Sequence, residues 1–412
     1  MSTLRQYGNQ LQRFQSNARL YLLHGFISGF GLGIVRLLFN FYVLSLGHDR
    51  ALLGLLVALP PILITVAAIP AGMIGHRVGY KATLIGGAVL MVGALAGLSS
   101  SASLVGLALF SACRGLSQTF LQVSSAPFMA ENSGASERTH LFSVQFATRT
   151  LASFFGCLVA GFLPMLLATM LAVGPEDPAA YRASLFFAAG LFALSILPLV
   201  RMRTAPRPDE AARPPSLREM FRPPGQLVRL FLPQVIIGFG AGALVPFLNV
   251  FLRAKFGLSD GFVGLLFAFQ SVAMAVATLV GPILAERLRR IRAVVWVQLL
   301  SIPFLILLGY TPFVWLSAVG FLARAGLMNM ANPLYTAFAM DAVKPERRPT
   351  ASALMQMSWQ GTRGLSALVS GQIQEGAGFS ALFPITIGCY LLATSLIHAF
   401  FGRKGSASPS SR

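Results

Sequence analysis

Residues 72–81 read GMIGHRVGYK, and residues 282–289, about 210 positions later, read PILAERLR. Three charged positions repeat at the same offset, and these pairs are Arg77 with Arg287, Arg114 with Arg324, and Glu131 with Asp341. Long apolar segments flank them in both copies. The sequence therefore predicts two related halves built of membrane helices, an arrangement typical of transporters.

The composition is that of a membrane protein. Hydrophobic residues make up 55% of 412 residues and charged residues only 11%, whereas roughly 25% of a soluble chain is charged. Apolar stretches of about 20 residues recur, long enough to cross a ~30 Å hydrocarbon layer as helices. We expect an all-α protein with twelve spans, at 18–46, 51–75, 81–100, 103–131, 140–173, 182–201, 228–256, 261–286, 292–310, 312–341, 349–375 and 378–401.

The spans group into two pseudo-symmetric six-helix bundles. The predicted parts are an N-terminal segment (1–17), a first bundle (18–201), a linker (202–227), a second bundle (228–402) and a tail (403–412). Most of the 32 Lys and Arg residues fall in the two ends, the linker and the loops on the same side. The positive-inside rule then places both termini in the cytoplasm. We expect a multi-pass protein integral to the cytoplasmic (plasma) membrane, an inner membrane. The net charge of +19 is thus a topology signal, and no nucleic-acid partner is expected.

The first loop resembles the signature of the major facilitator superfamily, Gly-x-x-x-Asp-Arg-x-Gly-x-Lys/Arg. Gly72, Arg77, Gly79 and Lys81 match the pattern, while His76 replaces the acidic residue. In the second copy the acid is present, as Glu286, and the glycines are missing. The resemblance implies that superfamily's fold and secondary transport by alternating access.

The two loops supply the predicted gating residues. Arg77 can reach Glu131 at the inner end of the fourth span, and Arg287 can reach Asp341 in the second half. In the resembled family such contacts latch the cytoplasmic side when the transporter opens outward; the alternative is that the charges anchor helix ends at the headgroups. The full set is Gly72, His76, Arg77, Gly79, Lys81, Glu131, Glu286, Arg287 and Asp341. His76 is expected to loosen the first latch or make it pH-sensitive.

Five arginines lie inside the apolar spans: Arg36, Arg114, Arg149, Arg324 and Arg363. A charge at the bilayer centre costs at least about 2.5–3.5 kcal/mol, so such residues normally face a wet cavity and serve a function. No Asp or Glu occupies the middle of any predicted span. Guanidinium groups favour bidentate pairing with carboxylate or phosphate, which predicts an anionic substrate or an amphiphile with an anionic head. For Arg114 and Arg324 the alternative is a structural role, because many members of the resembled family keep a structural arginine at the Arg114 position.

Polar side chains follow the arginines at helical spacing, as in Arg114, Gln118 and Gln122 at i, i+4 and i+8. In the layout of the resembled family these stripes converge on one central cavity. The predicted substrate-binding residues are Arg36, Asn40, Arg114, Gln118, Gln122, Gln145, Arg149, Asn249, Arg324, Asn332, Tyr335, Gln356, Trp359, Gln360 and Arg363. The alternatives are interhelical hydrogen bonding for the glutamines and packing for Trp359 and Tyr335.

The sequence contains few residues that indicate energy coupling or catalysis. His24 in the first span is the proton-coupling candidate, with a structural histidine as the alternative. The sequence contains no Gly-x-x-x-x-Gly-Lys-Ser/Thr loop and no His-Glu-x-x-His pair. We therefore expect no enzyme activity, cofactor or metal.

The expected function is secondary active transport of a small organic anion or anionic amphiphile through a central arginine-lined cavity, by a monomer in the lipid bilayer. Two alternatives remain open. One is an exporter or flippase of hydrophobic or amphipathic compounds, as in multidrug-type efflux. The other is a non-transporting membrane sensor or scaffold.

Overall fold

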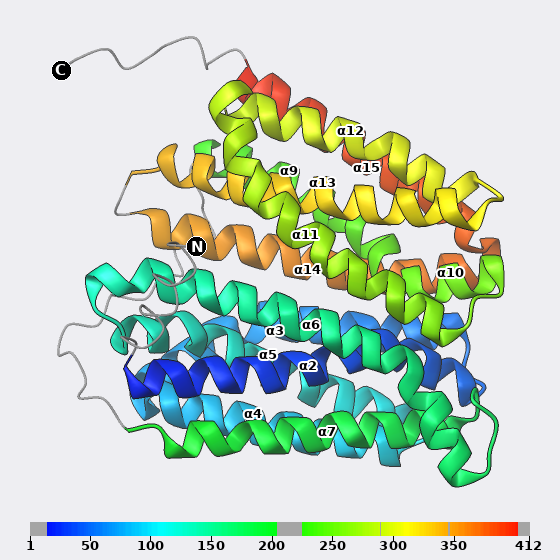
Figure 1. The fold of residues 1–412 in the computed structure, drawn as a ribbon. Helices are drawn as coiled ribbons and strands as arrows, with labels where there is room; N and C mark the ends of the chain where they lie inside the picture. Colours follow the sequence, from blue (N-terminus) through cyan, green and yellow to red (C-terminus); the bar gives the residue numbers. More distant parts are fainter. Residues whose placement is uncertain (1–14, 204–224, 289, 345–346, 403–412) are drawn as a thin grey trace, which may run out of the picture. The chain divides into compact units, whose positions relative to one another are not determined.

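The computed structural model describes residues 15–203, 225–288, 290–344 and 347–402, and these contain no strand (Figure 1). Nearly all of the predicted N-terminal segment, the linker and the tail lie outside the described residues. The helices of the first half are α2 (Ser16–Ser45), α3 (Arg50–Val78), α4 (Tyr80–Ser100), α5 (Leu104–Glu131), α6 (Ala135–Leu171) and α7 (Pro178–Arg201). Those of the second half are α9 (Gly225–Leu244), α10 (Leu248–Phe256), α11 (Asp260–Leu288), α12 (Arg290–Tyr310), α13 (Val314–Asp341), α14 (Arg348–Ala377) and α15 (Leu382–Ile397), with a π-helical turn η4 (His398–Gly402) after α15.

The all-α prediction is confirmed, and the spans fall close to their predicted places. In the described residues, eleven helical segments are long and apolar enough to cross a membrane. One of these, Leu227–Phe256, joins α9 to α10 through the 3-10 turn η1 (Val245–Phe247), where Pro246 interrupts the α-helix. The remaining predicted span, 349–375, is α14, which is 30 residues long but more polar, because it carries Gln356, Gln360 and Arg363.

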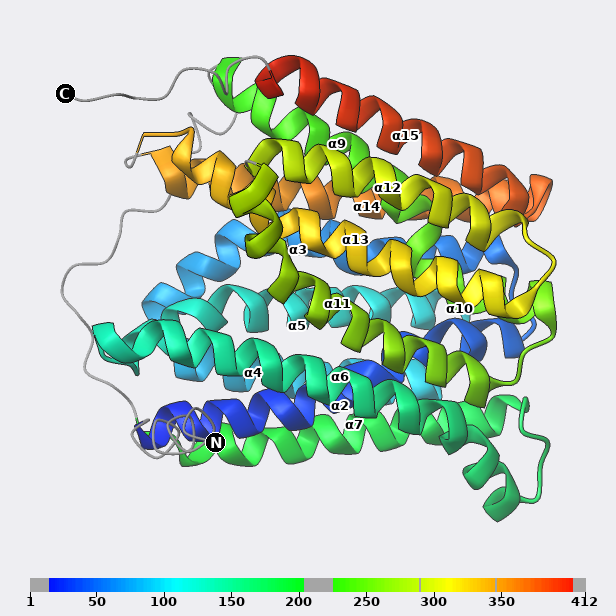
Figure 2. The same cartoon turned by 45° about the horizontal axis from the view of Figure 1, so that its top comes forward.

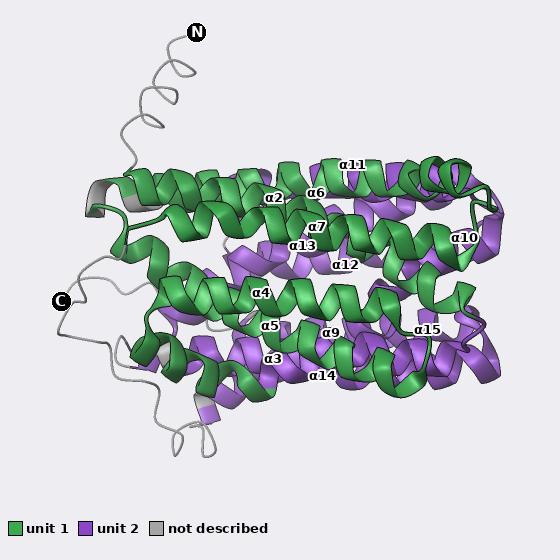
Figure 3. Cartoon of the chain, turned by 90° about the horizontal axis from the view of Figure 1, so that it is seen from below, with its two compact units in different colours: residues 1–46, 66–213 green, residues 47–65, 214–412 purple. Residues whose placement is uncertain are grey.

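The chain forms two compact units, residues 1–46 with 66–213 and residues 47–65 with 214–412 (Figure 3). The first part of α3 therefore belongs to unit 2, where it packs on α14. A Cβ atom on Gly54 would lie 2.7 Å from the Cα of Gly371, so the two backbones are nearly in contact. The backbone N–H of Arg50 also donates to the Glu375 carboxylate (3.1 Å). Two glycines facing each other allow this approach, which any side chain would prevent.

Helices related by the sequence repeat pack in the same way inside each unit. In unit 1, α2 packs on α6 and α7, and α4 packs on α5. In unit 2, α9 packs on α14 and α15, and α12 packs on α13. The repeat read from the sequence is thus a repeat of helix pairing.

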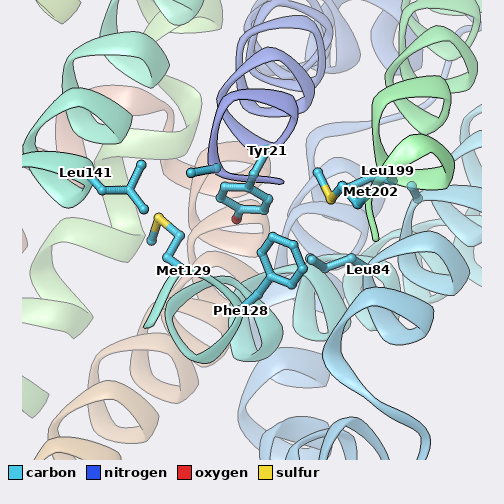
Figure 4. Close-up of a cluster of buried hydrophobic side chains, with 9 residues drawn as sticks. Tyr21, Leu84, Phe128, Met129, Leu141, Leu199 and Met202 are labelled. Carbon is cyan, nitrogen blue, oxygen red and sulfur yellow. The ribbon is translucent and has the colours of Figure 1, made fainter. Parts of the chain in front are cut away.

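One end of unit 1 is closed by an apolar cluster around Tyr21 of α2. Leu84, Phe128, Leu141 and Leu199 of four other helices surround the ring (Figure 4). Each of these side chains is at most 3% exposed. This packing holds the start of α2 and orients the polar residues on its next turns.

Candidate functional site

Arg149 and Arg363 occupy equivalent places in the two units, each opposite a glycine of the neighbouring helix. A Cβ on Gly29 of α2 would lie 3.9 Å from the carbonyl oxygen of Arg149 on α6. A Cβ on Gly242 of α9 would lie 2.6 Å from both the Cα and the carbonyl oxygen of Arg363 on α14. The glycines let the helices cross at the arginine. The repeat therefore sets an arginine at the same helix crossing in each unit.

Hydrogen bonds across each crossing fix the helices that carry these arginines. In unit 2 the hydroxyl of Ser366 donates to the carbonyl of Phe239, and that of Ser370 donates to the carbonyl of Ala243 (2.5 Å). In unit 1 the thiol of Cys157 lies 3.7 Å from the carbonyl oxygen of Gly33. These contacts fix the backbones of the two crossing helices, and they thereby fix the positions of the Cα atoms of Arg149 and Arg363.

The three arginines beside these crossings are accessible within their units. Arg36 and Arg149 are exposed and Arg363 is half-buried. Arg36 lies within electrostatic reach of Cys157 of α6, so it borders the same crossing as Arg149. The guanidinium of Arg363 lies 5.7 Å from the centre of the Trp359 ring. These three side chains are therefore less enclosed by their own units than the two arginines described next.

Arg114 and Arg324 are enclosed instead. Arg114 is 8% exposed, with its guanidinium 4.2 Å from the centre of the Phe39 ring on α2. Arg324 is 4% exposed and donates to the hydroxyl of Tyr390 on α15. In the described structure the Nε atom of each has no hydrogen-bond partner. Aromatic faces stabilise both cations inside their own units.

A polar network near Arg149 links α2, α5 and α6. The Tyr21 hydroxyl donates to Ser125 Oγ (2.6 Å), and the side-chain amide of Gln145 donates to the same oxygen (3.2 Å). Arg149 lies within electrostatic reach of both Tyr21 and His24. The network holds the predicted residue Gln145 in place one helical turn before Arg149.

His24 is buried, only 4% exposed, beside this network. Its Nδ1 lies 2.9 Å from the carbonyl oxygen of Ser195 on α7. Because a carbonyl only accepts, Nδ1 carries the hydrogen in this contact. His24 therefore connects α2 to α7, and its role in proton coupling stays a prediction.

A polar pocket of about 240 Å³ lies in unit 2 between α9, α13 and α14. It brings together three predicted residues, Asn332, Gln356 and Trp359. Its other lining residues are Gln234, Thr336, Met340, Ser352 and Met355. The lining carries amide and hydroxyl groups and no charge, so it suits a neutral polar group with several hydrogen-bonding atoms.

The other predicted substrate residues divide by burial. Gln122 is exposed and Gln118 is half-buried on α5. The buried ones are Asn40, Asn249, Tyr335 and Gln360. The hydroxyl of Tyr335 donates to the carbonyl of Leu230 on α9 (2.6 Å). That contact occupies its only donor, so Tyr335 ties α13 to α9.

The first loop is organised as its glycines suggest. Gly79 has a φ of +100°, which favours glycine, and a Cβ on Gly72 would touch Val123 at 3.4 Å. Lys81 Nζ donates to the carbonyls of Met202 (2.6 Å) and Val200 (3.2 Å) at the end of α7. His76 and Arg77 are exposed. Arg77 and Glu131 both make interactions, and their mutual pairing stays a prediction.

The second loop differs from the expected pairing. Asp341 forms its ion pair with Arg290, the first residue of α12, and not with Arg287. The side chain of Arg290 thus connects α12 to Asp341 at the end of α13. Glu286 and Arg287 are exposed on the last turn of α11.

Sequence reasoning missed several pocket and network residues. Thr336 lies one turn after Asn332, and Ser352 lies one turn before Gln356, so helical spacing could have found both. Gln234 is an amide within an apolar span, a signal of the same kind. Tyr21 gave no such signal, because a tyrosine near a span end is typical of any membrane interface.

Comparison with known proteins gives one family and one fold. The family model described as Major Facilitator Superfamily matches residues 21–236 and 230–412. The nucleoside transporter NupG is similar with a TM-score of 0.76 at 13% identity, covering 95% of this chain and 100% of that one. A bacterial homolog of the human lysosomal transporter Spinster, inward-facing and occupied, has a TM-score of 0.71 at 16% identity, covering 96% and 98%.

A third similar structure is the human organic anion transporter MFSD10 (TETRAN), with a TM-score of 0.60 at 17% identity, covering 93% of this chain and 99% of that one. At such identities the likeness shows the fold alone. No curated protein matches the sequence.

Proposed function

The chain belongs to the major facilitator superfamily, and from this membership we propose that it is a secondary active transporter of a small organic anion or anionic amphiphile. It is a multi-pass integral membrane protein. In the proposal it works by alternating access through an arginine-lined cavity. It acts as a monomer in the cytoplasmic membrane, with both termini in the cytoplasm.

The observation that carries the proposal is the repeated arginine at the repeated helix crossing. Arg149 and Arg363 both lie opposite a glycine, and both remain accessible. A guanidinium in an apolar span is costly, so such a residue normally serves a function. Guanidinium groups favour bidentate pairing with a carboxylate or phosphate, the groups that an organic anion carries. Arg36, beside the first crossing, adds a third positive charge.

The pocket in unit 2 refines the substrate. Trp359 lines the pocket and also lies against the guanidinium of Arg363. An anionic group on Arg363 would therefore place the neighbouring part of the substrate over the indole ring and toward Asn332 and Gln356. At about 240 Å³ the pocket is smaller than the roughly 300–1,000 Å³ of drug-sized sites. A small anion with hydroxyl or amide groups fits this better than a bulky amphiphile.

Reconstituted vesicles test the proposal. Uptake of labelled organic anions is measured for the wild type, for Arg149→Gln and for Arg363→Gln, with Arg201→Gln at the exposed end of α7 as the control. Loss of a charge-assisted contact of about 1.5–3 kcal/mol should lower uptake tenfold or more in the two site variants, with membrane insertion unchanged. Unchanged uptake in both would refute the site. Transport of apolar compounds alone would support the exporter, and ligand binding without flux the sensor.

A further inference from the structure

A groove on the surface of unit 2 has no part in the site above. It runs between α12 and α15, which lie side by side (Figure 2). Its volume is about 600 Å³, and it is lined by Arg292, Val295, Trp296 and Leu299 of α12 and by Ser395 and His398 of the facing segment, among others. None of the predicted substrate or gating residues lines it.

The body of the groove is apolar and opens outward. Trp296 is 61% exposed although it lies inside a span. In a bilayer such a side chain meets acyl chains. From Arg292 to Leu299 the α12 wall runs for seven residues, which is about 10 Å at helical rise. That depth is about two thirds of one leaflet of a ~30 Å hydrocarbon layer.

One end of the groove is basic. Arg292 is exposed in the first turn of α12, and His398 is exposed where α15 passes into the π-helical turn η4. Among the residues described, no acidic side chain lines the groove. The nearby carboxylate of Asp341 is already paired with Arg290. The positive charge at this end is therefore available to an outside anion.

The floor of the groove is fixed rather than collapsible. The Thr394 hydroxyl donates to the side-chain oxygen of Gln298 (3.1 Å), and both residues are buried. This bond joins α15 to α12 directly below the groove. A concave apolar surface of fixed width with a basic end differs from the convex helix faces that ordinary boundary lipid covers.

We propose that the groove binds one anionic phospholipid of the adjacent leaflet. The phosphate contacts Arg292 and His398, and an acyl chain lies along Val295, Trp296 and Leu299. Basic pockets between helices at the headgroup level bind such lipids. The bound lipid bridges α12 and α15, so it stabilises unit 2.

The purified full-length protein in neutral detergent tests this with two readouts, thermal stability and lipid adducts in native mass spectrometry. Phosphatidylglycerol is compared with phosphatidylcholine of the same chains and with inorganic phosphate. Phosphatidylglycerol should stabilise the wild type and give a discrete adduct. Arg292→Gln should weaken its binding about fivefold, the factor for one basic residue near the surface. Arg201→Gln, an exposed arginine at a helix end of unit 1, should bind like the wild type.

A second variant checks the apolar wall. Trp296→Ala should also weaken phosphatidylglycerol binding, whereas Trp315→Ala, at a still more exposed tryptophan outside the groove, should not. Equal binding of phosphatidylcholine, or no effect of Arg292→Gln, would overturn the proposal. Equal stabilisation by inorganic phosphate would show an anion site without a lipid and would overturn it too. Each readout is independent of transport, so these results leave the proposed function untouched.

Discussion

The α2–α6 crossing of unit 1 and the α9–α14 crossing of unit 2 share one plan but differ in where they are tightest. In unit 2 the closest approach to the backbone of α14 is at the arginine itself, where a Cβ on Gly242 would lie 2.6 Å from the Cα of Arg363. In unit 1 it is about two helical turns after Arg149 on α6, where a Cβ on Gly156 would lie 2.3 Å from the Phe30 carbonyl oxygen. Arg149 is accordingly exposed and Arg363 half-buried. Two copies of one sequence pattern can therefore leave their arginine side chains exposed to different extents.

The largest effect should come from filling the tight crossing. Gly242→Ala places a methyl group against the backbone of Arg363, which cannot move without shifting α14. Overpacking of this kind costs about 1–3 kcal/mol. We expect a lower unfolding temperature of the purified protein and reduced transport.

Gly29→Ala is the matched change in unit 1 and should cost less. Its Cβ would lie 3.9 Å from the Arg149 carbonyl, although it would meet the Cβ of Ala152 at 3.0 Å. Equal destabilisation by the two substitutions would contradict the difference between the crossings.

A smaller effect should follow from removing the partner of the enclosed Arg324. Tyr390→Phe keeps the ring and deletes the hydroxyl that accepts from the guanidinium. A hydrogen bond to a charged group contributes about 1.5–3 kcal/mol, and the retained ring should offset part of the loss. Thermal unfolding should shift downward while the substrate concentration at half-maximal uptake stays the same. A large change in that concentration at unchanged stability would assign Arg324 to the substrate instead.

The smallest effect is expected at the end of α7. Lys81→Met removes the ammonium that binds the carbonyls of Val200 and Met202. A cation at a helix C-terminus contributes about 0.3–1 kcal/mol. Stability should fall slightly, and Lys344→Met, at an exposed lysine after α13, should change nothing. If Lys81→Met alters transport without altering stability, Lys81 has a gating role and does not merely cap the C-terminus of α7.

The fold was predictable to a large extent, whereas the site was predictable only in part. Apolar length and the repeated charges located the spans, and helical spacing identified the polar stripes on single helices. That stripes of different helices meet followed only from the family resemblance, and the pocket in unit 2 brings Asn332 of α13 to Gln356 and Trp359 of α14. Helical spacing could not predict that Arg324 is buried and Arg363 only half-buried, since both arginines lie within polar stripes. The two differ in burial, because Arg324 is 4% exposed and donates to the Tyr390 hydroxyl of α15, whereas Arg363 is half-buried beside Trp359 of its own helix.

The loop pairing shows the same limit. The repeat offset matched Asp341 with Arg287, but the ion pair forms with Arg290. Arg287 lies on the last turn of α11, whereas Arg290 belongs to the next helix, α12. A sequence repeat gives the spacing of residues along the chain, but it does not determine which way each side chain points or which residue it contacts.

The sequence by itself determined that this protein is a helical membrane protein built of two related halves, because apolar length and periodicity are properties of short segments and bilayer thickness acts on them locally. Only the tertiary structure decided which buried-span arginines are enclosed by aromatic rings and which remain accessible. That outcome depends on contacts such as Arg114 with Phe39 and Arg363 with Gly242. These partners are far apart in the chain, and backbone approach at a glycine sets the distance between them.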